Sequence, residues 1–229
     1  MPGLSDPIPA YVIHSRPYRN SSLMLTCLTQ SYGRVVVAAR SARGPKSRFR
    51  GQLQSFIPLL MQWREGRDIY SLSHLELRRE PQLLFGSALL CAFYVNELLW
   101  HLTLAGSASD ELFFHYEKVL SDLSTRTDYE RVLRLYEKQL LIDLGYGISW
   151  THTAAHHEPI MPDQLYTFEC QFGFSKLEKP SGRCYLGRSL LAMASNEIKD
   201  CDLLAMKHLM RRQMAFYLGN KAIHTRDFF

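Results

Sequence analysis

The spacing of apolar residues changes at Pro81, and this change is the strongest constraint on the fold. Before Pro81, short apolar runs alternate between two faces and are separated by turn signals such as Tyr32-Gly33 and Gly66. We expect five strands, at about residues 11–15, 23–29, 34–39, 56–63 and 69–77. Five strands in so short a stretch, with no helical pattern among them, predict a small closed or partly open barrel.

After Pro81 the apolar residues recur with the period of an α-helix. Ser87 and Ser109 are suitable N-caps for two helices, and Thr127 to Glu130 matches a capping box that would begin a third. Further helical patterns cover residues 188–194 and 200–218. Between them the chain is rich in Gly, Pro and His, with one plausible hairpin that pairs 165–170 with 172–175. The sequence therefore predicts an α+β protein, with a barrel over residues 1–80 and a helical domain over 81–229 that contains a small irregular insert at 146–187.

Composition narrows the class of protein. Apolar residues make up 46% of the chain and charged residues 21%, as in ordinary folded domains. The longest uncharged, mostly apolar stretch runs from Gln82 to Asn96, short of the ~20 residues that span a bilayer, so we expect no membrane partner. The first residues lack a secretory pattern, and the five cysteines form no CxxC pair. We expect free thiols and a cytoplasmic location.

The positive charge is concentrated in the first third. Residues 1–80 hold twelve Lys and Arg against five Asp and Glu, whereas residues 81–229 hold fifteen against seventeen. Between Pro7 and Arg64 there is no carboxylate at all. Such a segment favours a polyanion, most commonly nucleic acid, although a basic surface for solubility or for an acidic protein partner is the alternative.

The loop from Arg40 to Arg50 combines cations with an aromatic ring, as single-strand binding sites do. Phe49 is either a stacking platform for bases or an anchor that packs on the barrel. Tyr32, at another strand end, is a further candidate for stacking. The predicted nucleic-acid surface comprises Arg16, Tyr18, Arg19, Arg34, Arg40, Arg43, Lys46, Arg48, Phe49 and Arg50.

A second basic feature lies on the third predicted helix. Arg131, Arg134 and Lys138 have the spacing i, i+3, i+7 and therefore share one face. Beside apolar residues, such a stripe suits an acidic peptide with a hydrophobic end. The alternative is a solvated face, on which Glu130 and Arg134 form an i,i+4 pair.

Catalytic motifs are absent from the sequence: there is no GxSxG, P-loop, GxGxxG or HExxH. His152, His156 and His157 cluster beside Glu158, but a structural zinc site usually needs two close ligand pairs. We expect no bound metal, no cofactor and no enzymatic activity. A metal-dependent hydrolase that uses His152, His156 and Glu158 is the opposing hypothesis.

Several runs, in order along the whole chain, resemble the bacterial recombination mediator family RecO. Those of the barrel start at Val12 (VIHSRPY), Ser22 (SLML), Tyr32 (YGR) and Leu53 (LQSFIPL), and those of the helical region are YVNELL at Tyr94, LGYG at Leu144 and YLGNK at Tyr217. Many relatives carry a four-cysteine zinc site in the insert. The matching stretch here, residues 151–159, has no cysteine pair, so the resemblance implies no zinc.

The resemblance implies an OB-fold barrel and a non-enzymatic DNA-repair factor that binds single- and double-stranded DNA, anneals complementary strands and associates with the nucleoid. It implies a partner called RecR, with which such proteins help to load RecA onto strands coated by single-strand-binding protein. The acidic tail of that coating protein docks on the helical domain in relatives, so that Arg131, Arg134 and Lys138 become expected tail contacts. An OB-type RNA-binding or ribosome-associated factor is the alternative, because a barrel alone does not distinguish DNA from RNA.

Overall fold

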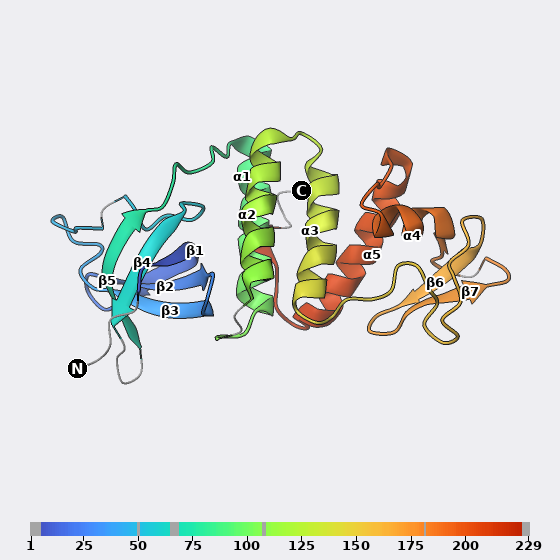
Figure 1. The fold of residues 1–229 in the computed structure, drawn as a ribbon, viewed down its shortest axis with the longest axis horizontal. Helices are drawn as coiled ribbons and strands as arrows, with labels where there is room; N and C mark the ends of the chain where they lie inside the picture. Colours follow the sequence, from blue (N-terminus) through green and yellow to red (C-terminus); the bar gives the residue numbers. More distant parts are fainter. Residues whose placement is uncertain (1–5, 50, 65–68, 107–108, 181, 226–229) are drawn as a thin grey trace. The chain divides into compact units, whose positions relative to one another are not determined.

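The computed structural model describes residues 6–49, 51–64, 69–106, 109–180 and 182–225. The chain forms two compact units, one of residues 1–126 with 222–229 and one of residues 127–221. In the described residues, the first unit contains five strands and two helices, and the second contains three helices and three short strands (Figure 1). The last strand of the barrel ends at Leu77, and the barrel packs in one unit with the first two helices.

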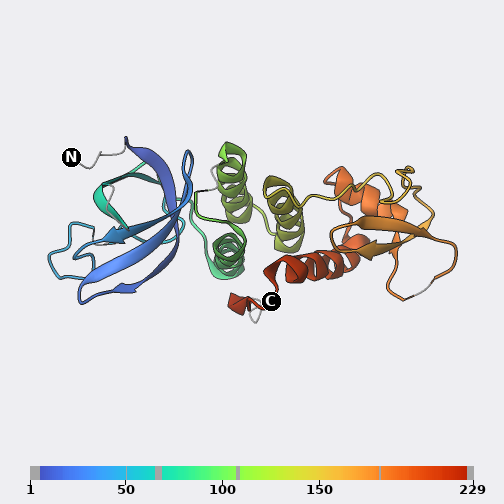
Figure 2. The same ribbon diagram turned by 90° about the horizontal axis from the view of Figure 1, so that it is seen from below.

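The first unit is built on a closed barrel (Figure 2). Its strands are β1 (Ile8–Tyr18), β2 (Ser22–Thr29), β3 (Gly33–Ala39), β4 (Leu59–Arg64) and β5 (Tyr70–Leu77). Their order is β1-β2-β3-β5-β4, and β1 pairs with β4 to close the barrel. The β3–β5 pair is parallel and the other pairs are antiparallel. The predicted five-stranded barrel of OB type is confirmed.

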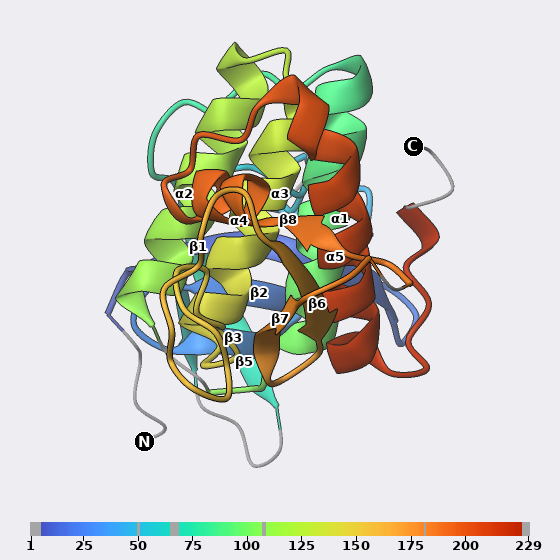
Figure 3. The same ribbon diagram turned by 90° about the vertical axis from the view of Figure 1, so that its right-hand side faces the viewer.

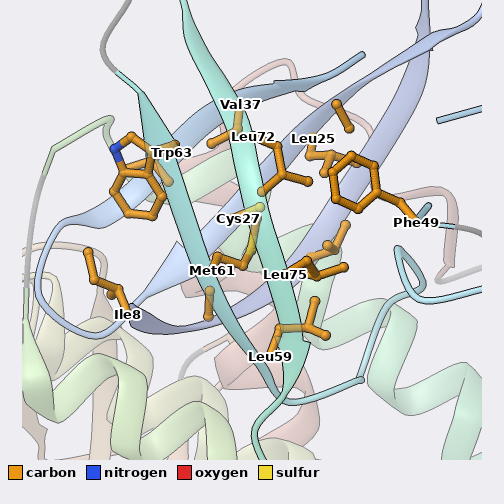
Figure 4. Packing of buried hydrophobic residues seen from close by; sticks show 14 residues of the cluster. Ile8, Leu25, Cys27, Val37, Phe49, Leu59, Met61, Trp63, Leu72 and Leu75 are labelled. Carbon is orange, nitrogen blue, oxygen red and sulfur yellow. The ribbon is translucent and has the colours of Figure 1, made fainter. Parts of the chain in front are cut away.

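Alternate residues of the strands fill the barrel interior. Val12, Leu25, Val37 and Met61 are almost completely buried there. Figure 4 shows Leu25, Val37 and Met61 gathered between the strands, with Phe49 entering from the loop that follows β3. The apolar runs of the sequence therefore specify the interior correctly.

Two helices complete the first unit: α1 (Gly86–Leu102) and α2 (Asp110–Thr125). Ser109 caps α2, as predicted, because its hydroxyl accepts a hydrogen bond of 3.1 Å from the Leu112 amide. The ring of Tyr11 on β1 packs at 5.1 Å from that of Tyr116 on α2. The barrel and its two helices thus share a packed boundary within this unit.

The second unit contains α3 (Tyr129–Asp143), α4 (Gly187–Ala194) and α5 (Asp200–Leu218), together with a sheet of order β7-β6-β8. The predicted hairpin is confirmed as β6 (Leu165–Glu169) and β7 (Gly173–Leu177), and β8 (Tyr185–Leu186) pairs with β6 (Figure 3).

The predicted capping box at Thr127 is wrong. Asp128 occupies the N-cap of α3 and makes no side-chain cap bond, because its carboxylate pairs with Arg131 instead. Within the described part of the chain, no helix is both long and apolar enough to cross a bilayer.

Candidate nucleic-acid interface

Hydrogen bonds join the β1–β2 turn to the basic loop that follows β3. The amide of Arg43 donates to the Ser21 carbonyl at 2.8 Å. Its guanidinium Nη2 donates to the carbonyls of Arg19 and Asn20 at 3.0 and 2.6 Å. Two segments that lie more than twenty residues apart in the sequence are thereby held together at one end of the barrel.

Strand register adds side chains from β1 to this end. Arg16 lies opposite Met24, which in turn lies opposite Ala38, and Tyr18 lies opposite Ser22. Because Ser15 and Leu25 form the neighbouring cross-strand pair and Leu25 points inward, Arg16 faces outward. The exposed cations of these segments form what we term the cationic surface: Arg16, Arg19, Arg40, Arg43, Lys46 and Arg48.

The charge of the cationic surface is not neutralised by ion pairs with the described residues. None of its six side chains forms an ion pair with a carboxylate in the described residues. Elsewhere in the same unit the pattern is different: Glu117 binds both Arg78 and Arg79 at 2.8 Å. Unpaired, solvated cations at one end of a barrel produce a local positive potential that attracts phosphate chains.

Arg34 does not belong to the cationic surface. It pairs with Leu28 near the opposite end of β3, about 20 Å from Arg40 at 3.3 Å per residue. Its Nη1 donates to the Trp100 carbonyl of α1 at 3.1 Å, and burial lowers the pKa of its guanidinium. The prediction that grouped Arg34 with the loop in one nucleic-acid surface is therefore wrong.

Phe49 is an anchor and not an exposed platform. Its side chain is 5% exposed in the barrel core, so it has no free face for a base. Arg48 lies 4.6 Å above the centre of its ring, which suggests that Phe49 positions this cation at the surface. Tyr18 remains half-buried, with Arg19 at 5.1 Å from its ring centre. Tyr32 packs against Trp63, and Arg50 lies outside the described residues.

The basic stripe on α3 is not an exposed surface. Arg134 is buried and pairs with Glu137 at 2.6 Å. Lys138 is also buried and donates to the Met193 carbonyl and to Asn196 Oδ1, each at 2.6 Å.

Arg131 pairs with Asp128 and Asp200, each at 2.6 Å. The shared face that the spacing predicts is real, but it packs against the segments of the second unit that carry these partners. The alternative Glu130–Arg134 pair is also wrong, because Glu130 pairs with Lys207.

The histidines of the insert lie on a loop, as expected. The rings of His152 and His157 stack at 4.4 Å. No group of three or more His, Cys, Asp or Glu is arranged to hold a metal ion in the described residues. The structure therefore gives no support to the hydrolase hypothesis, and the lack of a metal requirement stays a prediction.

These features define a class: an OB-type barrel with an unpaired cationic end, joined to a helical region. Residues 7–80 match the family described as Recombination protein O N terminal, and residues 86–214 match Recombination protein O C terminal. The chain belongs to the RecO family of DNA repair proteins.

Several proteins of this family are similar over most of their length. The DNA repair protein RecO of Coxiella burnetii (strain CbuG_Q212) is 42% identical, over 96% of this chain and 95% of its own length. The protein of that name from Nitrosospira multiformis is 37% identical, over 96% of this chain and 92% of its own length. The DNA repair protein RecO of Vibrio cholerae (strain O395) is 35% identical, over 96% of this chain and 91% of its own length.

Proposed function

We propose that this chain is a cytoplasmic, nucleoid-associated mediator of recombinational repair that binds single- and double-stranded DNA through the cationic surface and promotes strand annealing without catalysing a chemical step. The observation that carries the proposal is the grouping of six exposed cations, unpaired with any described carboxylate, at one end of the barrel. Membership of a family of DNA repair proteins supports DNA as the ligand.

The proposed mechanism is charge neutralisation. Two complementary strands repel each other through their phosphates, and contacts with Arg and Lys lower this repulsion and release condensed counterions. Because phosphate contacts carry no sequence information, base edges stay available for pairing. Annealing then needs only that the protein hold backbones and leave bases exposed.

The proposed partners follow from the family. We propose that RecR and the tail of single-strand-binding protein bind this chain, and that RecA loading follows indirectly. A tether to the coated strand would raise the local concentration of the cationic surface. Since Arg131, Arg134 and Lys138 are engaged within the second unit, tail binding through them requires that these internal pairs open, and their role stays a prediction.

A strand-annealing assay tests the proposal. Complementary oligonucleotides, bare or coated with single-strand-binding protein, are mixed with the chain or with its Arg16→Ala/Arg40→Ala/Arg48→Ala variant. We expect the wild-type chain to accelerate annealing and the variant to lose most of this effect. Equal rates for both proteins would refute the cationic surface as the annealing site. Competition between matched DNA and RNA strands separates this function from RNA binding, the alternative for an OB-type barrel.

A further inference from the structure

A cleft in the first unit is lined by aromatic rings, and one of its residues, His14, lies two positions before Arg16 of the cationic surface on β1. It has a volume of about 290 Å³, near the lower end of the ~300–1,000 Å³ of ligand pockets, and so suits one small planar group. Ile13 and His14 of β1 form one side, and Phe93, Asn96 and Trp100 of α1 form the other. The imidazole of His14 stacks on the Trp100 indole, with ring centroids 4.2 Å apart and an angle of 4° between the ring planes.

Asn96 lines the cleft and carries a buried hydrogen-bond donor without a partner among the described residues. Its side chain is 3% exposed, and its Oδ1 accepts a hydrogen bond of 2.7 Å from the Tyr116 hydroxyl. Its Nδ2 has no partner among the described residues. A buried amide without a partner is costly, so a ligand that presents an acceptor to Nδ2 gains binding energy.

The negative charge of the cleft favours a neutral base over an anionic phosphate as its occupant. Glu97 lines it, and its carboxylate already accepts hydrogen bonds from the amides of His224 and Thr225 and from the Thr225 hydroxyl. Burial raises the pKa of Glu97, but these hydrogen bonds outweigh burial and hold it below its usual value, so Glu97 is ionised at neutral pH. An anionic phosphate is repelled there, whereas a neutral base is not.

Arg16 lies close enough for its charge to act on His14, two residues earlier on the same strand and about 6.6 Å away along it. Burial lowers the pKa of His14, and the charge of Arg16 lowers it further, which keeps the imidazole a neutral stacking surface at pH 7. A phosphate bound by Arg16 thus leaves its own base within reach of the cleft.

From these observations we infer that the cleft between β1 and α1 captures one unstacked base of a single DNA strand whose backbone lies on the cationic surface. The rings of His14, Trp100 and Phe93 supply apolar contact, and Asn96 Nδ2 donates to the base. Every base carries an acceptor, so the contact discriminates single strands from duplex more than one sequence from another. This inference rests on the proposed function for the backbone contacts.

The first test compares two ligands of equal length, an oligothymidylate and a fully abasic sugar–phosphate chain. We expect the wild-type chain to bind the first roughly tenfold more tightly, because base–aromatic stacking contributes that order of affinity. Trp100→Leu should abolish this preference and leave the salt dependence unchanged. Phe114→Leu, which removes a 60% exposed ring from α2, should behave as wild type.

The outcomes distinguish the two hypotheses. Equal wild-type binding of both ligands, or a preference that survives Trp100→Leu, overturns the base cleft and leaves the cationic surface intact. Such a result would also be expected if the cleft received an apolar side chain of a protein partner. Failure of the wild-type chain to bind either ligand in a salt-dependent manner overturns the proposed function itself.

A second measurement uses the unmodified chain, so that it does not depend on the folding of a variant. An oligonucleotide with 5-iodouracil at every position is cross-linked by light, and the modified peptides are identified by mass spectrometry. We expect cross-links at His14, Phe93 or Trp100. Cross-links confined to the loop of residues 40–49 would overturn the inference.

Discussion

The cationic surface predicts a specific salt dependence for DNA binding. If all six cations contact phosphates of a single strand, log affinity falls with log salt at a slope of roughly −4, about −0.7 for each contact. Between about 50 and 200 mM salt, affinity should therefore fall roughly 300-fold. The exposure of these side chains and their lack of described carboxylate partners justify counting each as a full contact.

The Arg16→Ala/Arg40→Ala/Arg48→Ala variant removes three of the six contacts and retains Arg43, whose guanidinium also holds the β1–β2 turn. Its slope should be roughly −2, and the same change in salt should weaken binding only about 20-fold. Fluorescence anisotropy with labelled oligonucleotides of several sequences, at a series of salt concentrations, measures both slopes. The affinity of the variant for every oligonucleotide sequence should fall by about the same factor.

Lys118→Ala is the matched control, because Lys118 is a cation of the same unit that pairs with Asp122 on α2, away from the cationic surface. It should leave the slope unchanged, as should Arg34→Ala, since Arg34 lies at the far end of β3. A triple variant that retains the wild-type slope, or an Arg34→Ala variant that lowers it as much as Arg40→Ala does, would refute the assignment.

Three further predictions concern stability. Phe49→Ala should cost ~3–5 kcal/mol in denaturant unfolding, because the ring fills the barrel core, and a cost near zero would contradict that placement. Arg134→Leu or Glu137→Leu alone should cost ~3–5 kcal/mol, whereas the double substitution should be close to neutral; additive losses would argue against a buried pair. The pKa of Glu97 is lowered in the folded chain. Its contribution to the free energy of unfolding is therefore fully present above the ordinary pKa of about 4.3, and it is lost as the pH falls through the pKa of the folded state. The protection factor of the Thr225 amide, which is the exchange rate of an unprotected amide at the same pH divided by that of Thr225, should consequently fall in acid, and an unchanged protection factor would contradict the anchor.

The barrel and its positive charge can be predicted from the sequence alone. Alternation of apolar residues through Val12, Leu25 and Val37 specifies which strand faces point inward, because side chains of a strand alternate strictly. The lack of carboxylates from Pro7 to Arg64 means that nearby residues of the same segment cannot neutralise its cations. Both conclusions are local, and both hold in the structure.

Which basic and aromatic side chains are exposed depends on how the elements pack against one another. The same one-dimensional pattern contains Arg16 on an outer face, Arg34 bonded to α1, and Arg134 buried beside Glu137. Helical spacing placed the stripe on one face correctly, but it does not state what packs on that face. Strand register and packing bring together residues that are far apart in the chain, such as the stacked rings of His14 and Trp100. The periodicity of a single segment cannot predict such a contact, because it carries no information about the other segment.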